Sequence, residues 1–234
     1  MASSRFHIRE TCDVSADSAF ILDAFDASLA HLESIGSGAQ WGAEPFSASA
    51  DRVKSATGVV TAAEAYRLNS DAGDPVRLFI AEVGVEDGEG DGSNSGSLDG
   101  LRVRTGDGGA RFLAVAAGSV RERWWPAYVS TPPHLAPVVA HAKAEGNPFY
   151  LEMLISDFRT GAARKGSGAA LVRRIREYAV AKGATSLFVD CWAGNDGNLA
   201  NFYVSQGFVP AGDFIAEKPG KDPWPGKLLR MDIS

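Results

Sequence analysis

The chain has 234 residues, of which 45% are hydrophobic and 22% charged, the composition of an ordinary globular protein. Its formal net charge of -6, without a basic block, excludes nucleic-acid binding by counterion release, so we expect no nucleic-acid partner. No stretch approaches the apolar length of a membrane span and the first residues form no apolar signal core, so we expect no membrane partner and a cytoplasmic location.

The cysteines and histidines indicate neither disulfides nor a metal. Cys12 and Cys191 lie far apart, which is typical of a reducing compartment without a disulfide framework. The histidines lack metal-ligand spacing and the acidic residues form no hard-cation loop, so we predict no metal site. The histidines are His7, His31, His134 and His141.

In chain order, the first half predicts a strand, two helices and a hairpin. Ser15 is the expected N-cap of the first helix, in which apolar residues recur at helical spacing, and Gly36 follows its end. The expected strands cover residues 5–10, 76–85, 102–104 and 111–120, and the helices residues 15–35, 49–68 and 135–145. Residues 86–100 are too polar to pack, so we predict a disordered insertion at the hairpin tip.

The second half alternates strands and helices. Strands are expected over residues 149–156, 186–192 and 208–214, with helices over 168–182 and 198–206, then a loop over 218–227 and a last strand over 228–233. Such alternation predicts a layered α/β domain whose neighbouring strands run parallel near the turn before the first of these helices. We treat residues 1–234 as a single domain.

The turn over residues 163–168 carries the clearest chemical signal. Gly166 and Gly168 follow a strand and open a helix, so backbone N–H groups gather at a helix N-terminus, where a pyrophosphate can dock. A Walker phosphate loop is excluded, since alanines stand where a Lys-Ser/Thr pair is needed. A dinucleotide fingerprint lacks its third glycine at Leu171 but has Asp190 in place for its acid, and a plain left-handed turn also stays open.

These residues resemble the GNAT superfamily of N-acetyltransferases, whose motif Q/R-x-x-G-x-G/A binds the pyrophosphate of acetyl-CoA. The two glycines fit, while Ala163 replaces the leading Gln/Arg, with Arg164 beside it. A second element, Asn198-Leu-Ala-Asn-Phe-Tyr203 followed by Gly207-Phe208, is similar to the family's N-x-x-A-x-x-x-Y-x-x-x-G-F pattern. The resemblance covers residues 149–214. It implies an α/β fold with a mixed, mostly antiparallel sheet, one parallel pair at the CoA-binding turn and helices on both faces.

The resemblance also implies an enzyme that moves an acetyl group from acetyl-CoA, its cosubstrate, to a primary amine of a small molecule or peptide by direct attack through a tetrahedral intermediate. Tyr203 is the expected partner of the departing thiolate. Main-chain groups of the strand near residues 154–156 would pair with the pantetheine arm, as in β-augmentation. The implied cofactor-binding residues are Leu154, Ile155, Ser156, Arg164, Lys165, Gly166, Ser167, Gly168, Ala169, Asn195 and Asn198.

Acetyl transfer to an amine also requires a general base. An ammonium substrate must lose a proton, which calls for a carboxylate or histidine. Glu152 is ranked first because it interrupts an apolar strand and can face a cleft; Asp157, Asp190 and Glu122 are alternatives. The resemblance also implies an acceptor pocket lined by aromatic residues, for which the candidates are Trp41, Trp124, Trp125 and Tyr128.

Three hypotheses therefore compete. The first is an acetyl-CoA-dependent N-acetyltransferase, the second a non-catalytic acyl-CoA-binding or regulatory module on the same scaffold, and the third an adenine-dinucleotide-binding α/β protein. The sequence does not reveal the identity of the acceptor. It does not reveal the oligomeric state either, and a homodimer stays open.

Overall fold

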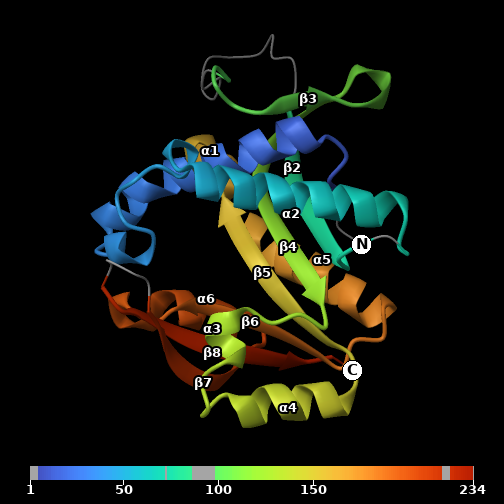
Figure 1. The fold of residues 1–234 in the computed structure, drawn as a ribbon. Helices are drawn as coiled ribbons and strands as arrows, with labels where there is room; N and C mark the ends of the chain where they lie inside the picture. Colours follow the sequence, from blue (N-terminus) through green and yellow to red (C-terminus); the bar gives the residue numbers. More distant parts are fainter. Residues whose placement is uncertain (1–4, 72, 86–97, 218–221, 234) are drawn as a thin grey trace.

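The sheet organises the molecule in a computed structural model that describes residues 5–71, 73–85, 98–217 and 222–233 (Figure 1). Its eight strands follow the order β1-β2-β4-β5-β6-β8-β7, with β3 paired to β4. The strands are β1 His7–Glu10, β2 Val76–Val85, β3 Val103–Thr105, β4 Arg111–Glu122, β5 Pro148–Ser156, β6 Ser186–Trp192, β7 Val209–Ala216 and β8 Trp224–Asp232.

The sheet is mixed and mostly antiparallel, as the resemblance implied. Among the described strands, only β5 and β6 pair in parallel. The expectation that neighbouring strands run parallel near the turn over residues 163–168 is confirmed by this pair. The chain's last strand, β8, inserts between β6 and β7 and pairs antiparallel with both, which sequence alternation cannot reveal.

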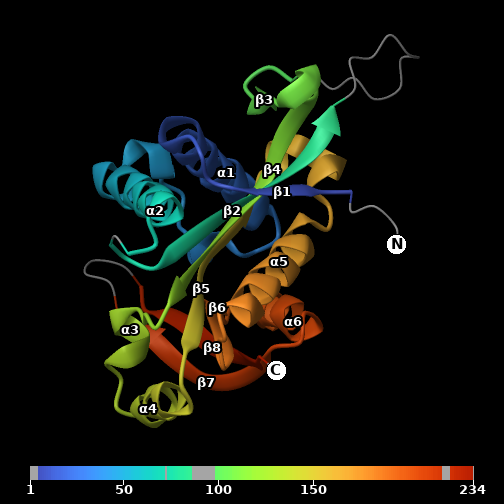
Figure 2. The ribbon, with the colours of Figure 1, turned by 90° about the vertical axis from the view of Figure 1, so that its right-hand side faces the viewer.

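Helices cover both faces, and Figure 2 shows α1 to α4 on one side of the sheet with α5 and α6 on the other. They are α1 Val14–Ser34, α2 Ala50–Leu68, α3 Ala127–Ser130, α4 Ala136–Glu145, α5 Ser167–Ala181 and α6 Asn198–Ser205. Among the described residues, none of the helices combines the length and the apolar character that crossing a bilayer requires.

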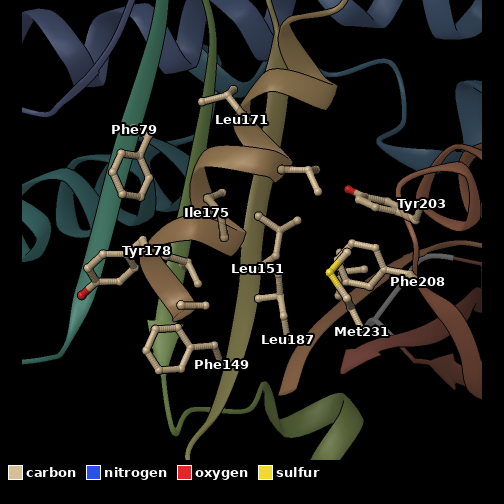
Figure 3. Close-up of a cluster of buried hydrophobic side chains, with 14 of the residues drawn as sticks. Phe79, Phe149, Leu151, Leu171, Ile175, Tyr178, Leu187, Tyr203, Phe208 and Met231 are labelled. Carbon is tan, nitrogen blue, oxygen red and sulfur yellow. The ribbon is translucent and has the colours of Figure 1, made fainter. Parts of the chain in front are cut away.

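Helix α5 shows how the pattern of apolar residues builds the core. Leu171, Ile175 and Tyr178 recur every three or four residues, so they form one buried stripe. Figure 3 shows this stripe facing Phe79 and Leu151 of the sheet, within a cluster that extends to α6. The stripe therefore holds the start of α5 at a fixed position beside β5.

The predicted element boundaries needed three corrections. Asp13, not Ser15, caps α1, because its side chain accepts a hydrogen bond from the backbone N–H of Ala16 and the helix begins one residue before Ser15. The last strand begins at Trp224 instead of residue 228, since residues 224–227 pair with β7. A short helix, α3, occupies the aromatic connection. Residues 86–97 of the predicted insertion and 218–221 of the predicted loop lie outside the described residues.

The sheet splits between β5 and β6. Their pairing runs from Pro148 with Ser186 to Leu151 with Val189 and stops there, while β5 continues beside β4 and β6 continues beside β8. In Figure 1 the two strands diverge beyond this point. The second half of β5 therefore has no strand partner on its β6 side within the described chain.

Candidate active site

A cavity of about 630 Å³ opens at this split and reaches both faces of the sheet. On the α5 and α6 side it is lined by the turn before α5 and by Tyr203. On the α1 and α2 side it is lined by aromatic residues of α1 and of the connection to α2, and by two carboxylates, Glu152 and Asp190. Because the cavity passes between the strands, groups on opposite faces can reach one ligand.

The turn before α5 presents unpartnered donors to the cavity. Gly166 has a left-handed backbone with φ of +88°, which favours glycine, and offers no side chain to cap the helix. Ser167 is fully buried, and its Oγ has no hydrogen-bond partner in the described part of the chain. A Cβ on Gly168 would lie 3.3 Å from Phe202, so a side chain there would crowd the site. This helix N-terminus is suited to an anion.

Arg164 adds a cation to the same end of the cavity. Its guanidinium carbon lies 3.7 Å from the centroid of the Phe158 ring. Its Nε atom is buried without a hydrogen-bond partner within the described residues. Burial lowers the pKa of Arg164, although the nearby charge of Asp157 opposes this. A bound anion would supply the missing partner. Lys165 also lines this end.

Tyr203 lies where α6 meets the cavity. Its side chain is 5% exposed and packs edge-on against Phe208, and Figure 3 shows its hydroxyl oxygen pointing away from Phe208 and toward α5. Burial, followed by the charges of Cys191 and Asp190, raises the pKa of Tyr203 well above its ordinary value of 10.0. The hydroxyl therefore stays protonated at neutral pH and is able to donate.

Glu152 owes its position to a β-bulge. Ser119 pairs with Met153 and Val120 with Leu151, so Glu152 is the extra residue on β5. Its Oε2 accepts a hydrogen bond from Arg121 Nε at 2.8 Å. Its Oε1 accepts no hydrogen bond from any described residue and is therefore the freer oxygen for a ligand.

Asp190, on β6, is the second carboxylate of the cavity. Tyr150 donates to its Oδ1 at 2.5 Å, and the Tyr128 hydroxyl lies 3.3 Å from the same oxygen. Burial and then the charge of Asp190 raise the pKa of both tyrosines. Two protonated hydroxyls thus hold the Asp190 carboxylate in place.

Comparisons with known proteins agree with this architecture. No family model and no curated protein matches the sequence. Among solved structures, a proposed acetyltransferase from Salmonella typhimurium, solved with its cofactor acetyl-CoA, is 12% identical with a TM-score of 0.53, covering 99% of this chain and 95% of that one. An N-acetyltransferase from Staphylococcus aureus Mu50 is 14% identical with a TM-score of 0.51, covering 99% and 100%. The chain has the GNAT fold.

A further similar structure is the ribosomal-protein-alanine N-acetyltransferase from Brucella melitensis, 14% identical with a TM-score of 0.50, covering 97% of this chain and 99% of that one. At this level of identity the similarity shows that the chain has the GNAT fold. The chemistry of the site depends on the residues of this chain.

Most of the residues that were predicted for the site lie around the cavity at the split. On the cofactor side these are Leu154, Ile155, Ser156, Arg164, Lys165, Gly166, Ser167, Gly168 and Ala169, and on the reacting and acceptor side Tyr203, Glu152, Trp41 and Tyr128. Segments as distant in the sequence as those of Trp41 and Tyr203 therefore meet at the split.

Four predicted residues do not line the cavity. Asn195 instead donates to Ile35 O at 3.0 Å and to Ser37 Oγ at 2.7 Å, so it ties the end of α1 to the turn before α6. Asn198 is the first residue of α6. Trp124 and Trp125 both pack against Tyr150 in a separate hydrophobic cluster, which accounts for these aromatic residues without a ligand.

The two remaining acids considered as bases have structural roles. Asp157 is fully buried, pairs with Arg159 at 2.7 Å and accepts from the Arg159 backbone N–H. Glu122 accepts hydrogen bonds from Tyr66 and Tyr178. Neither lines the cavity.

Sequence reasoning missed the opposite wall of the cavity. Trp224 lines it because β8 inserts beside β6, and its Nε1 donates to Gln40 O at 3.0 Å. Phe25 and Phe46 line it from α1 and the connection to α2. Phe25 has the spacing of an ordinary core residue, so no local pattern marks it as a site residue.

Both cysteines are free, and no group of three potential metal ligands occurs in the described part of the chain.

Proposed function

We propose that this protein transfers the acetyl group of acetyl-CoA to a primary amine. The observation that carries the proposal is the cavity through the split sheet, which has an uncapped helix N-terminus on one face and a pair of carboxylates on the other. Similarity to acetyltransferases of the same fold supports it.

The residues at the turn fit the pyrophosphate of acetyl-CoA. The pyrophosphate would be held by the first backbone N–H groups of α5, by the Arg164 guanidinium and by Ser167 Oγ, which has no hydrogen-bond partner among the described residues, with Lys165 adding charge. The unpaired side of β5 over residues 154–156 would hydrogen-bond the pantetheine arm. When bound, acetyl-CoA supplies the activated acetyl thioester.

The side chains of the cavity would supply acid and base catalysis. Glu152 is the proposed proton acceptor, because no described residue donates a hydrogen bond to its Oε1 while Arg121 fixes its other oxygen. Asp190 would attract and orient the ammonium form of the acceptor. Tyr203 would donate its hydroxyl proton to the departing sulfur and take a proton back from solvent after the thiol leaves. Its raised pKa keeps the hydroxyl protonated at neutral pH before each turnover.

Turnover with acetyl-CoA tests the proposal. The purified chain is expected to release CoA thiol from acetyl-CoA when amines are added, and saturating acetyl-CoA at about 100 times its Kd should add about 2.7 kcal/mol to the free energy of unfolding. Stabilisation by acetyl-CoA without turnover across a broad amine panel would favour a non-catalytic acyl-CoA-binding module. Stabilisation by NAD and not by CoA would contradict the proposal.

Replacement of Arg164 by alanine tests the anion site. We expect Arg164→Ala to raise the Kd for CoA by about tenfold, because a charge-assisted hydrogen bond is lost, with the effect measured by calorimetry. Arg176→Ala is the matched control, since Arg176 is an exposed arginine of α5, the helix that follows the turn, and does not line the cavity. Equal Kd values for the wild type and Arg164→Ala would remove Arg164 from the anion site.

A further inference from the structure

The acceptor side of the cavity is walled by aromatic rings. Phe25 stacks on Phe46 with ring centroids 4.4 Å apart, and Trp41 meets both rings edge-on at 5.6 and 5.7 Å. Tyr128 and Trp224 line the side that belongs to the other half of the sheet. Rings held in this way offer apolar surface and cation-attracting faces at little cost in side-chain entropy.

The charges on this side favour an ammonium group and disfavour a carboxylate. Glu152 and Asp190 are the carboxylates among the described lining residues, whereas Arg164 and Lys165 belong to the turn before α5. Arg52 is the remaining lining cation; its guanidinium lies 4.1 Å from the centroid of the Phe46 ring and donates to Glu44 O at 2.9 Å and Trp41 O at 3.3 Å. A carboxylate directly beside the ammonium group would still meet the like charges of Glu152 and Asp190.

A strap formed by residues 35–41 bridges the two halves of the sheet beside the cavity. It is fastened at one end by Asn195, which donates to Ile35 O and Ser37 Oγ, and at the other by Trp224, which donates to Gln40 O. Gln40 and Trp41 of the strap line the cavity. The strap is therefore a fixed wall of the acceptor side, which limits the room for an acceptor there.

The size of the cavity leads to the same conclusion. Its volume of about 630 Å³ lies within the range of a pocket for one drug-sized ligand, and it must hold both the acyl arm of the cosubstrate and the acceptor. The space left for the acceptor is therefore small.

We propose that the acceptor is a small monoamine with an aromatic or apolar body and no carboxylate. This inference rests on the proposed function and narrows it: the ammonium lies between Glu152 and Asp190, and the apolar body lies against Trp41, Phe25 and Phe46. Free amino acids and protein N-termini are excluded as preferred acceptors.

The test compares matched acceptors with the full chain and saturating acetyl-CoA, by initial rates of CoA release. 2-Phenylethylamine is expected to exceed phenylalanine, which adds only a carboxylate, by about tenfold or more in kcat/KM, and to exceed a tetrapeptide by at least as much. Faster turnover of phenylalanine or the tetrapeptide would overturn the inference and leave the proposed acetyl transfer standing. Absence of turnover with every amine would overturn both.

Variants of Trp41 test the wall itself. Trp41→Ala is expected to lower the ratio of kcat/KM for 2-phenylethylamine over n-propylamine by about tenfold, since only the larger amine reaches the aromatic wall, while Trp41→Phe keeps most of that ratio. Melting temperatures of both variants verify that they fold. An unchanged ratio in folded Trp41→Ala would place the acceptor elsewhere and overturn the inference.

Discussion

Replacement of Tyr203 by phenylalanine is expected to lower kcat by about 100-fold with little change in KM for acetyl-CoA, because proton donation to the leaving sulfur matters only in the transition state. The ring is buried and packs against Phe208, so its apolar contacts survive the loss of the hydroxyl. Among the described residues, the hydroxyl has no hydrogen-bond partner, so no structural bond is broken. Steady-state kinetics measures the effect.

Tyr178→Phe is the matched control for Tyr203→Phe. Its hydroxyl donates to Glu122 at 2.8 Å, away from the cavity, so its loss should lower the melting temperature and leave kcat unchanged. Because burial raises the pKa of Tyr203 above 10.0, the wild-type rate should also show no loss from tyrosine deprotonation up to pH 9. A Tyr203→Phe variant with wild-type kcat would remove Tyr203 from the proton transfer.

The order of elements in the second half could be predicted because each depends on local pattern. The stripe of Leu171, Ile175 and Tyr178 has the period of a helix, and β6 is a continuous apolar run. The turn at Gly166 could also be read, since only a few residue types suit a left-handed backbone before a helix.

The split in the sheet and the composition of the site could not be predicted, because they depend on contacts between segments distant in the sequence. The pairing of β5 with β6 ends at Leu151 because β5 continues beside β4 and β6 continues beside β8. Strand β8 lies more than thirty residues downstream of β6, so no local pattern predicts that it pairs there. Asn195 illustrates the difficulty: the resemblance assigns it to the cofactor, while the structure uses it to hold the strap. Trp124 and Trp125 were predicted to line the pocket because a sequence does not show whether an aromatic side chain packs in a hydrophobic cluster or faces a cavity.

Glu82 is buried far from the active site and illustrates how charge is stabilised in this core. It is 1% exposed on β2 and accepts hydrogen bonds from Arg9 at 2.7 Å and from Arg104 at 2.6 Å, with His7 at 3.2 Å. Arg9 continues the network to Asp17. Burial alone would raise the pKa of Glu82, but the hydrogen bonds and charges of Arg104 and Arg9 outweigh it and hold that pKa below 4.5.

Glu82→Gln should therefore lower the free energy of unfolding by about 3 kcal/mol, because the charge-assisted hydrogen bonds to Arg9 and Arg104 are lost and Arg9 keeps only Asp17 as its carboxylate partner. Since the pKa is lower in the folded state, Glu82 stabilises the protein above pH 4.5, and this contribution is lost as the pH falls through the folded pKa. Urea unfolding between pH 3 and 7 measures both effects, and the difference between wild type and variant should shrink at acidic pH. Glu64→Gln, which breaks a surface pair with Arg67, is the control with little expected change. Equal stabilities of Glu82→Gln and Glu64→Gln at pH 7 would show that the buried pair contributes no more than the surface pair.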